Sequence, residues 1–218
     1  DFNVEIPINY FSENDGRSFS NKIAVKLSEK LSALFIYTNE VSDATKVPTP
    51  SKYLDKTENY GDNLFFNLQY DFNDMSSVNV VVEDINRSSR VISTQANLEN
   101  MTGILYDEMI SNTITERTRI SAKYSYEADN DSAFINKAQS TIFWQEGNTN
   151  DNFRRENEIS KQDKIYNLTN KLIGINADFN TYMTLFNDTH LLSYGIDISE
   201  NDGSRTRDTI NLITGESK

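Results

Sequence analysis

The feature that most constrains this 218-residue chain is a repeated alternation of apolar and polar residues in segments of about ten residues. In residues 63–72, for example, Leu64, Phe66 and Leu68 fall at one parity, whereas most residues at the other parity are polar. Successive side chains of a β-strand point to opposite faces, so this pattern predicts strands with one apolar and one polar face. No segment has a helical period over a length that forms a core, and we expect an all-β, antiparallel fold.

The alternation predicts about ten strands, which are 2–11, 18–27, 31–38, 63–72, 76–83, 114–127, 134–145, 164–179, 190–199 and 209–213. The faces of 164–179 do not separate cleanly. Leu168 and Leu172 fall at one parity, whereas Ile173 and Ile175 fall at the other. A β-bulge is one way to shift the phase within such a strand.

The connections between these segments differ in length, and the long ones fall at alternate strand ends. Short connections are expected at 28–30, 73–74, 128–132 and 180–189, and long ones at 39–62, 84–112, 146–163 and 200–208. The turn at 12–16 belongs to the rim of the long connections but is itself short. Residues 98–110, within the second long connection, can form a short helix.

Composition excludes several classes of protein. The net charge is −12, the isoelectric point is about 4.6 and the mean hydropathy is −0.61, with no run of about twenty apolar residues. A helical membrane protein is therefore excluded, and the acidic balance argues against a nucleic-acid partner. The chain has no cysteine, which removes disulfides and Cys-based zinc sites. An aromatic content of 11% argues against disorder.

The alternating connections favour a transmembrane β-barrel of the outer-membrane type. In such a barrel only every second strand residue meets lipid, aromatic residues gather at the two interfaces, and lumen positions are polar. Phe72, Trp144 and Tyr10 are expected at the interfaces. Five charged residues are expected to face the lumen, namely Arg117, Arg119, Lys123, Asp71 and Glu83.

Two other folds share the alternation. A soluble antiparallel sheet or β-sandwich binding module with one wet face produces the same pattern. Against it stand the expected lengths of 114–127 and 164–179, which exceed the usual five or six residues of a strand, and the alternating connections. A complete small barrel of eight to ten strands with a structural or adhesive role is the other alternative.

The C-terminal part also resembles a known family. The stretches 191–199 (LLSYGIDIS), 204–208 (SRTRD) and 211–216 (NLITGE) resemble a barrel segment of TonB-dependent receptors. The similarity is greatest to the haem/haemoglobin and transferrin/lactoferrin receptor group. Residues 143–145 (FWQ) and 117–121 (RTRIS) support it, and the resemblance spreads over most of the chain.

The resemblance implies an outer-membrane transporter of 22 antiparallel strands, closed by an N-terminal plug domain. The TonB energy-coupling complex pulls on that plug, and the ligand is haem or an iron-carrying host protein. The chain then transports and is not an enzyme. Residues 1–218 would form a β-barrel segment of a longer protein, with no plug domain, coupling box or histidine motif of the haem receptors among them.

Few residues suggest chemistry of their own. His190, the single histidine, is either an axial haem ligand or a polar residue at a strand end, and we favour the second interpretation. The carboxylate pairs Asp129/Asp131 and Asp107/Glu108 are expected to be solvated, so no catalytic or metal-binding residues are predicted. The segments 39–62, 84–112 and 146–163 either contact a ligand or only shield the barrel. Haem is a possible cargo, and no resident cofactor or cofactor-binding residue is assigned.

Overall fold

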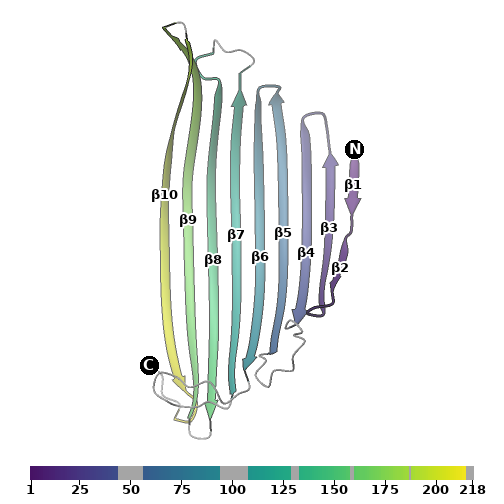
Figure 1. Ribbon diagram of the computed structural model, residues 1–218, viewed down its shortest axis with the longest axis vertical. Helices are drawn as coiled ribbons and strands as arrows, with labels where there is room; N and C mark the ends of the chain where they lie inside the picture. Colours follow the sequence, from purple (N-terminus) through teal and green to yellow (C-terminus); the bar gives the residue numbers. More distant parts are fainter. Residues whose placement is uncertain (44–55, 94–107, 129–132, 158–159, 187, 215–218) are drawn as a thin grey trace.

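The computed structural model describes residues 1–43, 56–93, 108–128, 133–157, 160–186 and 188–214, and all regular structure in them is β-strand. One antiparallel sheet of ten strands contains all of it (Figure 1). The strands are β1 (Phe2–Glu5), β2 (Ile8–Phe11), β3 (Gly16–Lys26), β4 (Leu31–Asp43), β5 (Lys56–Asn73), β6 (Ser76–Ser93), β7 (Glu108–Glu127), β8 (Lys137–Asn157), β9 (Ser160–Leu185) and β10 (Asp188–Asn211). The expected all-β, antiparallel fold is confirmed.

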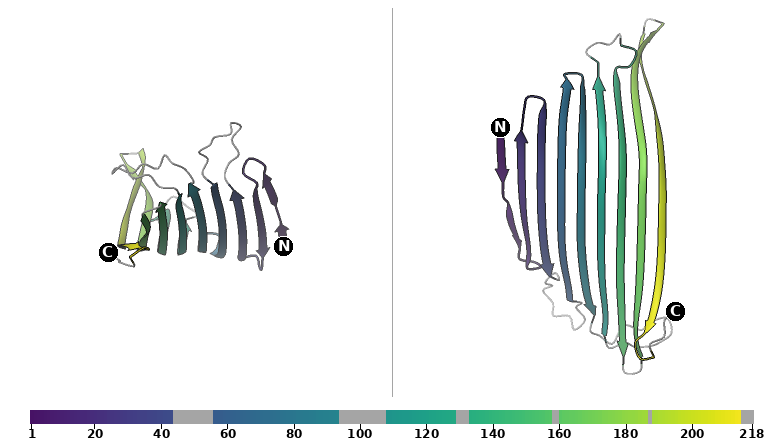
Figure 2. Two further views of the ribbon diagram at one scale, coloured as in Figure 1. Left: turned by 90° about the horizontal axis from the view of Figure 1, so that it is seen from below. Right: turned by 180° about the vertical axis from the view of Figure 1, so that it is seen from behind.

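The strands lie side by side in chain order. β1 and β2 both pair with β3, and from β3 to β10 each strand pairs with the next. Figure 2 shows a single gently curved layer whose two edges lie far apart, with β1 and β2 at one edge and β10 at the other. Within the described residues the sheet is therefore open, and no second layer covers either of its faces.

About ten strands were predicted and the described residues form ten, but the bounds of the strands differ near both ends of the chain. Residues 2–11 were expected as one strand, and the structure divides them into β1 and β2. Pro7 lies between them and has no N–H to give to the ladder, although its carbonyl still accepts a hydrogen bond from Ser20 N at 3.1 Å. Residues 190–199 and 209–213 were expected as two strands, yet 190–199 and 209–211 belong to one strand, β10, which ends at Asn211. The predicted loop at 200–208 is wrong.

The predicted long connection at 146–163 and the connection at 180–189 are also wrong. β8 and β9 continue through 146–163 and leave only residues 158–159 between them, and β9 and β10 continue through most of 180–189. The segment Arg154-Arg155-Glu156 thus lies in β8 and not in a loop. In 146–163, main-chain hydrogen bonds between β8 and β9 sustain the extension, although most side chains on both faces are polar there and carry no alternation signal.

The other two long connections are shorter than predicted. β4 continues to Asp43 and β5 begins at Lys56, whereas β6 continues to Ser93 and β7 begins at Glu108. Of the helix predicted at 98–110, residues 98–107 lie outside the described residues, and 108–110 are strand. Pairing along the described length of β9 is continuous, so the suggested bulge is absent there. A register shift occurs in β5 instead, between Asp71 and Asn73.

The strand ends define two rims. We call them the upper and lower rims, as they lie in Figure 1. The ends that flank 44–55, 94–107 and 158–159 lie at the lower rim, and those that flank 27–30, 74–75, 128–136 and 186–187 lie at the upper rim. The two longest intervals between strands thus fall at one rim, as predicted. The connection at 158–159 breaks the strict alternation, because β8 and β9 extend further than the other strands.

Candidate functional site

The register of the sheet brings the apolar parities of successive strands onto one face. This face carries the even-numbered side chains of β1, β2, β5, β6, β7, β8 and β10 and the odd-numbered side chains of β3, β4 and β9. We call it the banded face and the opposite one the polar face. Its apolar band consists of Ile23, Val25, Ala33, Phe35, Leu64, Phe66, Leu68, Val78, Val80, Val82, Ile120, Ala122, Ile142, Trp144, Ile173, Ile175, Ala177, Ile196 and Ile198.

Aromatic residues border this band. At the upper border the rings of Tyr70 and Phe72 meet edge to face at 5.0 Å, and those of Phe179 and Tyr194 stack at 5.4 Å. At the lower border Trp144 lies between Ile120 and Ile173 on the neighbouring strands.

Tyr10, which was also expected at a border, lies elsewhere. It belongs to β2, pairs with Arg17 near the lower rim, and donates a hydrogen bond to Asp15 at 2.8 Å. Its register row passes through Val41 and Tyr60, nearer the lower rim than the row of Trp144. The positions expected for Phe72 and Trp144 therefore fit the borders of the band, and the position expected for Tyr10 does not.

The polar face carries all five residues that were predicted to face a lumen. The side chains of Arg117, Arg119, Lys123, Asp71 and Glu83 lie at parities opposite the apolar band. The Nη2 of Arg117 donates to the Oε2 of Glu83 at 2.7 Å, across the neighbouring strand. The sequence alternation thus separated these residues from the apolar band, whereas the lumen they were expected to face stays a prediction.

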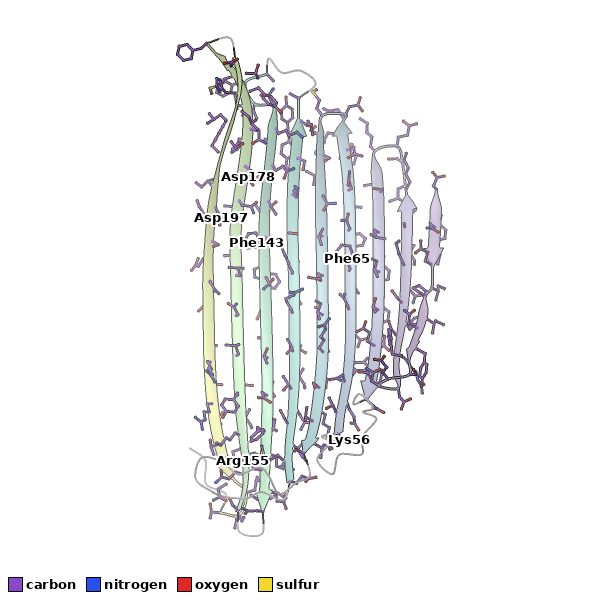
Figure 3. All side chains as sticks on the ribbon, viewed as in Figure 1. Lys56, Phe65, Phe143, Arg155, Asp178 and Asp197 are labelled. Carbon is purple, nitrogen blue, oxygen red and sulfur yellow. The ribbon has the colours of Figure 1, made fainter. Side chains whose placement is uncertain are left out.

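Two phenylalanines also lie on the polar face at the height of the band, Phe65 on β5 and Phe143 on β8 (Figure 3). Gly174 of β9 pairs with Phe143, and a Cβ added to this glycine would lie 2.5 Å from the Cζ of the ring. The missing side chain of Gly174 therefore leaves room for the Phe143 ring against the sheet.

Between the apolar band and the lower rim, the strands continue with mostly polar residues on both faces. On the banded face, cations of this extension are paired with carboxylates across or along the strands. The pairs include Lys56–Glu58 at 2.6 Å, Arg154–Asp163 at 2.7 Å, Lys161–Glu156 at 2.6 Å and Lys171–Glu146 at 3.4 Å. The extension of the banded face also carries many further carboxylates, such as Asp84, Glu116 and Asp202.

The polar face of the same extension has the opposite balance of charge. Its described carboxylates are Glu40, Glu83 and Asp151, whereas its cations are Arg87, Arg117, Arg119, Arg155, Lys164, Arg205 and Arg207. Because the whole chain carries a net charge of −12, this excess of cations is local. The extension thus presents an acidic surface on one face and a basic surface on the other.

Four of these cations form a cluster on β8, β9 and β10, which we call the basic wall: Arg155, Lys164, Arg205 and Arg207. The guanidinium groups of Arg205 and Arg207 lie 5.9 and 5.5 Å from the centre of the Tyr166 ring. Contacts of this kind hold a guanidinium plane in place without neutralising its charge.

The other half of the basic wall lies on β8 and β9. The Arg155 guanidinium lies 5.9 Å from the centre of the Phe153 ring, and Arg155 Nη2 donates to Gln162 Oε1 at 3.3 Å. Lys164 pairs with Phe153 on β8 and is half-buried. Its pKa is lowered from the ordinary value by burial, and then by the positive charges of Arg155 and Arg207. Positive charge is therefore concentrated around Lys164, and no carboxylate among the described residues forms an ion pair with it.

The nearest carboxylate on this face is already satisfied by hydroxyl groups. Asp151 lies in the same register row as Tyr166 and Arg207, and its Oδ1 accepts hydrogen bonds from Ser111 Oγ and Thr113 Oγ1, both at 3.1 Å. Among the described residues, neither Lys164 nor Arg205 nor Arg207 forms an ion pair with a carboxylate.

The remaining residues considered from sequence fall into no site. His190 pairs with Met183 near the upper rim and is exposed, far along β10 from the basic wall. Asp107, Asp129 and Asp131 lie outside the described residues, and Glu108 begins β7. Across the described ranges, no group of three or more His, Asp or Glu residues could hold a metal ion. The described part of the chain contains no helix long and apolar enough to span a membrane.

Sequence reasoning missed the basic wall, although one signal for it was present. Arg205 and Arg207 share a parity, which places them on one face of any strand through 204–208. That segment was predicted as a loop, and in a loop a shared parity does not place two side chains on one face. Comparison with known proteins adds no assignment, because no family model matches the chain and no curated protein matches it significantly.

Proposed function

We propose that this chain forms part of an outer-membrane β-barrel, in which the banded face contacts lipid and the polar face lines the lumen. The observation that carries the proposal is the confinement of the apolar band to one face and one height of the sheet. A soluble sheet would bury such a band under a second layer. Within the described residues no layer covers it, and Ile142, Ile173 and Ile196 remain more than half exposed.

The height of the band matches a bilayer. Along β5 the band and its aromatic border run from Leu64 to Phe72, which is about 26 Å at about 3.3 Å per residue. A tilted strand crosses the hydrocarbon layer with about 9–11 residues. The strands are much longer than this, since β9 has 26 residues and β10 has 24. Their remaining length would project into water beyond one surface of the membrane.

The lower rim would be the extracellular one. In outer-membrane barrels the longer connections are extracellular and the periplasmic turns are short. The two longest intervals between strands, 44–55 and 94–107, both adjoin the lower rim. The extension of the strands toward this rim would then form a vestibule whose inner wall is the polar face and includes the basic wall.

Closure of the barrel would require strands beyond these ten. β10 offers an edge of 24 residues, whereas β1 and β2 offer only 4 residues each. If β10 paired with β1 and β2, most of its outer edge would lack partners, which is costly in a membrane and exposed to aggregation in water. A large barrel therefore fits these edges better than a complete barrel of eight to ten strands.

Among large barrels, we infer a TonB-dependent receptor for haem or another iron source. The resemblance of 191–216 to that family supports this inference. A wide polar inner wall on the extracellular side of the membrane, toward the lower rim, supports it as well. The plug domain and its contact with the energy-coupling complex would lie outside residues 1–218. Ligand capture would occur in the vestibule, and transport would follow from movement of the plug.

Iron-limited growth tests this function. A strain deleted for the full gene would be supplied with haem, with haemoglobin or with a ferric salt as the only iron source. We expect growth on haem or haemoglobin to fall and growth on the ferric salt to persist. Undiminished growth on both haem sources would contradict the proposed cargo.

Two cheaper measurements address the other two folds. A mature protein of about 25 kDa would favour the complete small barrel, whereas a much larger mass would favour the receptor. A protein found in the soluble fraction without detergent would favour a β-sandwich module.

A further inference from the structure

We infer that the basic wall, formed by Arg155, Lys164, Arg205 and Arg207, binds a compact polyanion that carries two or more carboxylate or phosphate groups. This inference rests on the proposed function for access from outside the cell, but the binding itself depends only on the polar face. Guanidinium groups suit both anion classes, because their paired N–H donors match the two oxygens of a carboxylate or phosphate.

The first argument is the absence of internal neutralisation. On the banded face of the same strands Arg154, Lys161 and Lys171 are each paired with a carboxylate within 4 Å. Among the described residues of the polar face, Lys164 and Arg207 have no such partner. A surface that only kept the protein soluble would have no reason to separate the two sets of cations by face.

The second argument is positioning. Tyr166 lies beneath both Arg205 and Arg207, and Phe153 lies beneath Arg155, so aromatic rings support the guanidinium groups of all three arginines. Supported guanidinium groups lose less conformational entropy when a ligand binds than unsupported ones do. The cluster is therefore preorganised to accept hydrogen-bonding anions.

The third argument is the state of Lys164. It lies in the register row of Thr209, two rows from Tyr166 and Arg207, and Arg155 lies on the adjacent strand. Burial and the charges of these two arginines disfavour its protonated form. An anion placed among the three cations would remove this repulsion, so the free protein is electrostatically strained in a way that the ligand relieves.

Calorimetric titration of the purified full-length protein in detergent tests the inference. Two probes distinguish the anion classes: trimesate, a planar tricarboxylate, and inorganic tripolyphosphate. We expect at least one of them to bind at low ionic strength, with affinity falling as salt rises. Binding of trimesate alone would assign carboxylates, binding of tripolyphosphate alone would assign phosphates, and binding of both would assign charge density. Binding of neither would overturn the inference.

Matched variants locate the site. Arg207→Gln and Lys164→Gln should each weaken binding by about tenfold, because each removes a charge-assisted hydrogen bond. Lys171→Gln removes a cation from the banded face of the same strand as Lys164, nearer the apolar band, and should leave affinity unchanged. Equal affinity of wild-type protein and the double variant Arg205→Gln/Arg207→Gln would overturn the assignment. A β-sheet circular dichroism spectrum confirms that each variant is folded.

The two proposals can fail separately. Anion binding and its loss in the Arg205→Gln/Arg207→Gln variant are measured without reference to lipid contact. Lipid contact is tested by variants in the apolar band. A protein that inserts in lipid but binds neither probe would overturn the site and leave the barrel intact. A protein that binds a probe through these residues but stays out of lipid would do the reverse.

Discussion

The ring of Phe143 occupies the space on the polar face where a side chain of Gly174 would project. A Cβ at position 174 would lie 2.5 Å from the ring and 3.0 Å from the carbonyl oxygen of Ile198. The contact joins β8 to β9 at the height of the apolar band. It pairs a large side chain with a residue that has none, so the residue types tolerated at the two positions depend on each other.

Gly174→Ala should therefore destabilise the protein, although alanine usually suits a strand better than glycine. We expect a loss of about 1–2 kcal/mol in the free energy of unfolding, because the Phe143 ring must move. Urea unfolding in lipid or detergent measures it. At Gly203 a Cβ would meet nothing closer than 3.8 Å, so Gly203→Ala is the control and should be neutral. A further Phe143→Ala change should remove most of the penalty at 174; equal penalties with and without the ring would argue against the contact.

Charge placed on the two faces of β9 should have opposite consequences. Ile175 lies in the apolar band and the neighbouring Asn176 lies on the polar face. In a membrane, Ile175→Arg should cost about 2–4 kcal/mol and impair insertion into liposomes, whereas Asn176→Arg should be tolerated. Protease protection of the protein after insertion provides the measurement. If both variants inserted equally well, the band would not face lipid.

The Arg154–Asp163 pair should make stability depend on acid pH. Arg154 Nε and Nη2 donate to the two oxygens of Asp163 at 2.7 and 2.9 Å, and these bonds hold the pKa of the nearly buried Asp163 carboxyl below its ordinary value. The stabilising contribution is then complete above the unfolded pKa of about 4 and is lost as pH falls through the lower folded pKa.

Asp163→Asn should accordingly cost about 1–2 kcal/mol at pH 7, and the difference from wild type should shrink toward pH 2–3. Hydrogen exchange of the β8–β9 hairpin at each pH gives the local stability. Asp208→Asn, at an exposed position of β10, serves as the control and should have little effect. A penalty that grew as the pH fell would show that the sign is wrong.

The turn between β5 and β6 should depend on one side chain. Asn73 Oδ1 accepts hydrogen bonds from Met75 N at 3.0 Å and Ser76 Oγ at 2.9 Å. Asn73→Ala removes both and should cost about 1 kcal/mol, whereas Asp74→Ala in the same turn should cost less. Denaturant unfolding of the two variants compares them. A larger loss for Asp74→Ala would place the stabilising contact elsewhere.

The sequence predicted best those strands whose two faces differ. β5 and β6 were found between 63 and 83 because Leu64, Phe66 and Val80 alternate with polar neighbours. The same strands continue to Lys56 and Ser93, where most side chains on both faces are polar and period-two alternation vanishes. Strand pairing by the backbone leaves no trace in such a composition, so these extensions were taken for loops.

The basic wall could not be predicted as a cluster, for a related reason. Tyr166 and Arg207 are 41 positions apart, and only the register between β9 and β10 brings them together. A shift of one residue would have moved Arg205 and Arg207 to the banded face. The face on which a residue lies follows from its parity within one strand, but its cross-strand neighbours depend on the register between two strands.

Site-directed spin labelling tests the lipid-facing band most directly. The chain has no cysteine, so single cysteines can be placed from position 77 to 82 of β6 and labelled after reconstitution in liposomes. We expect oxygen accessibility to peak at Val78, Val80 and Val82, and accessibility to a water-soluble nickel complex to peak at the odd positions between them. Even positions shielded from both reagents, as beneath a second sheet, would contradict the lipid-facing band and with it the proposed membrane function.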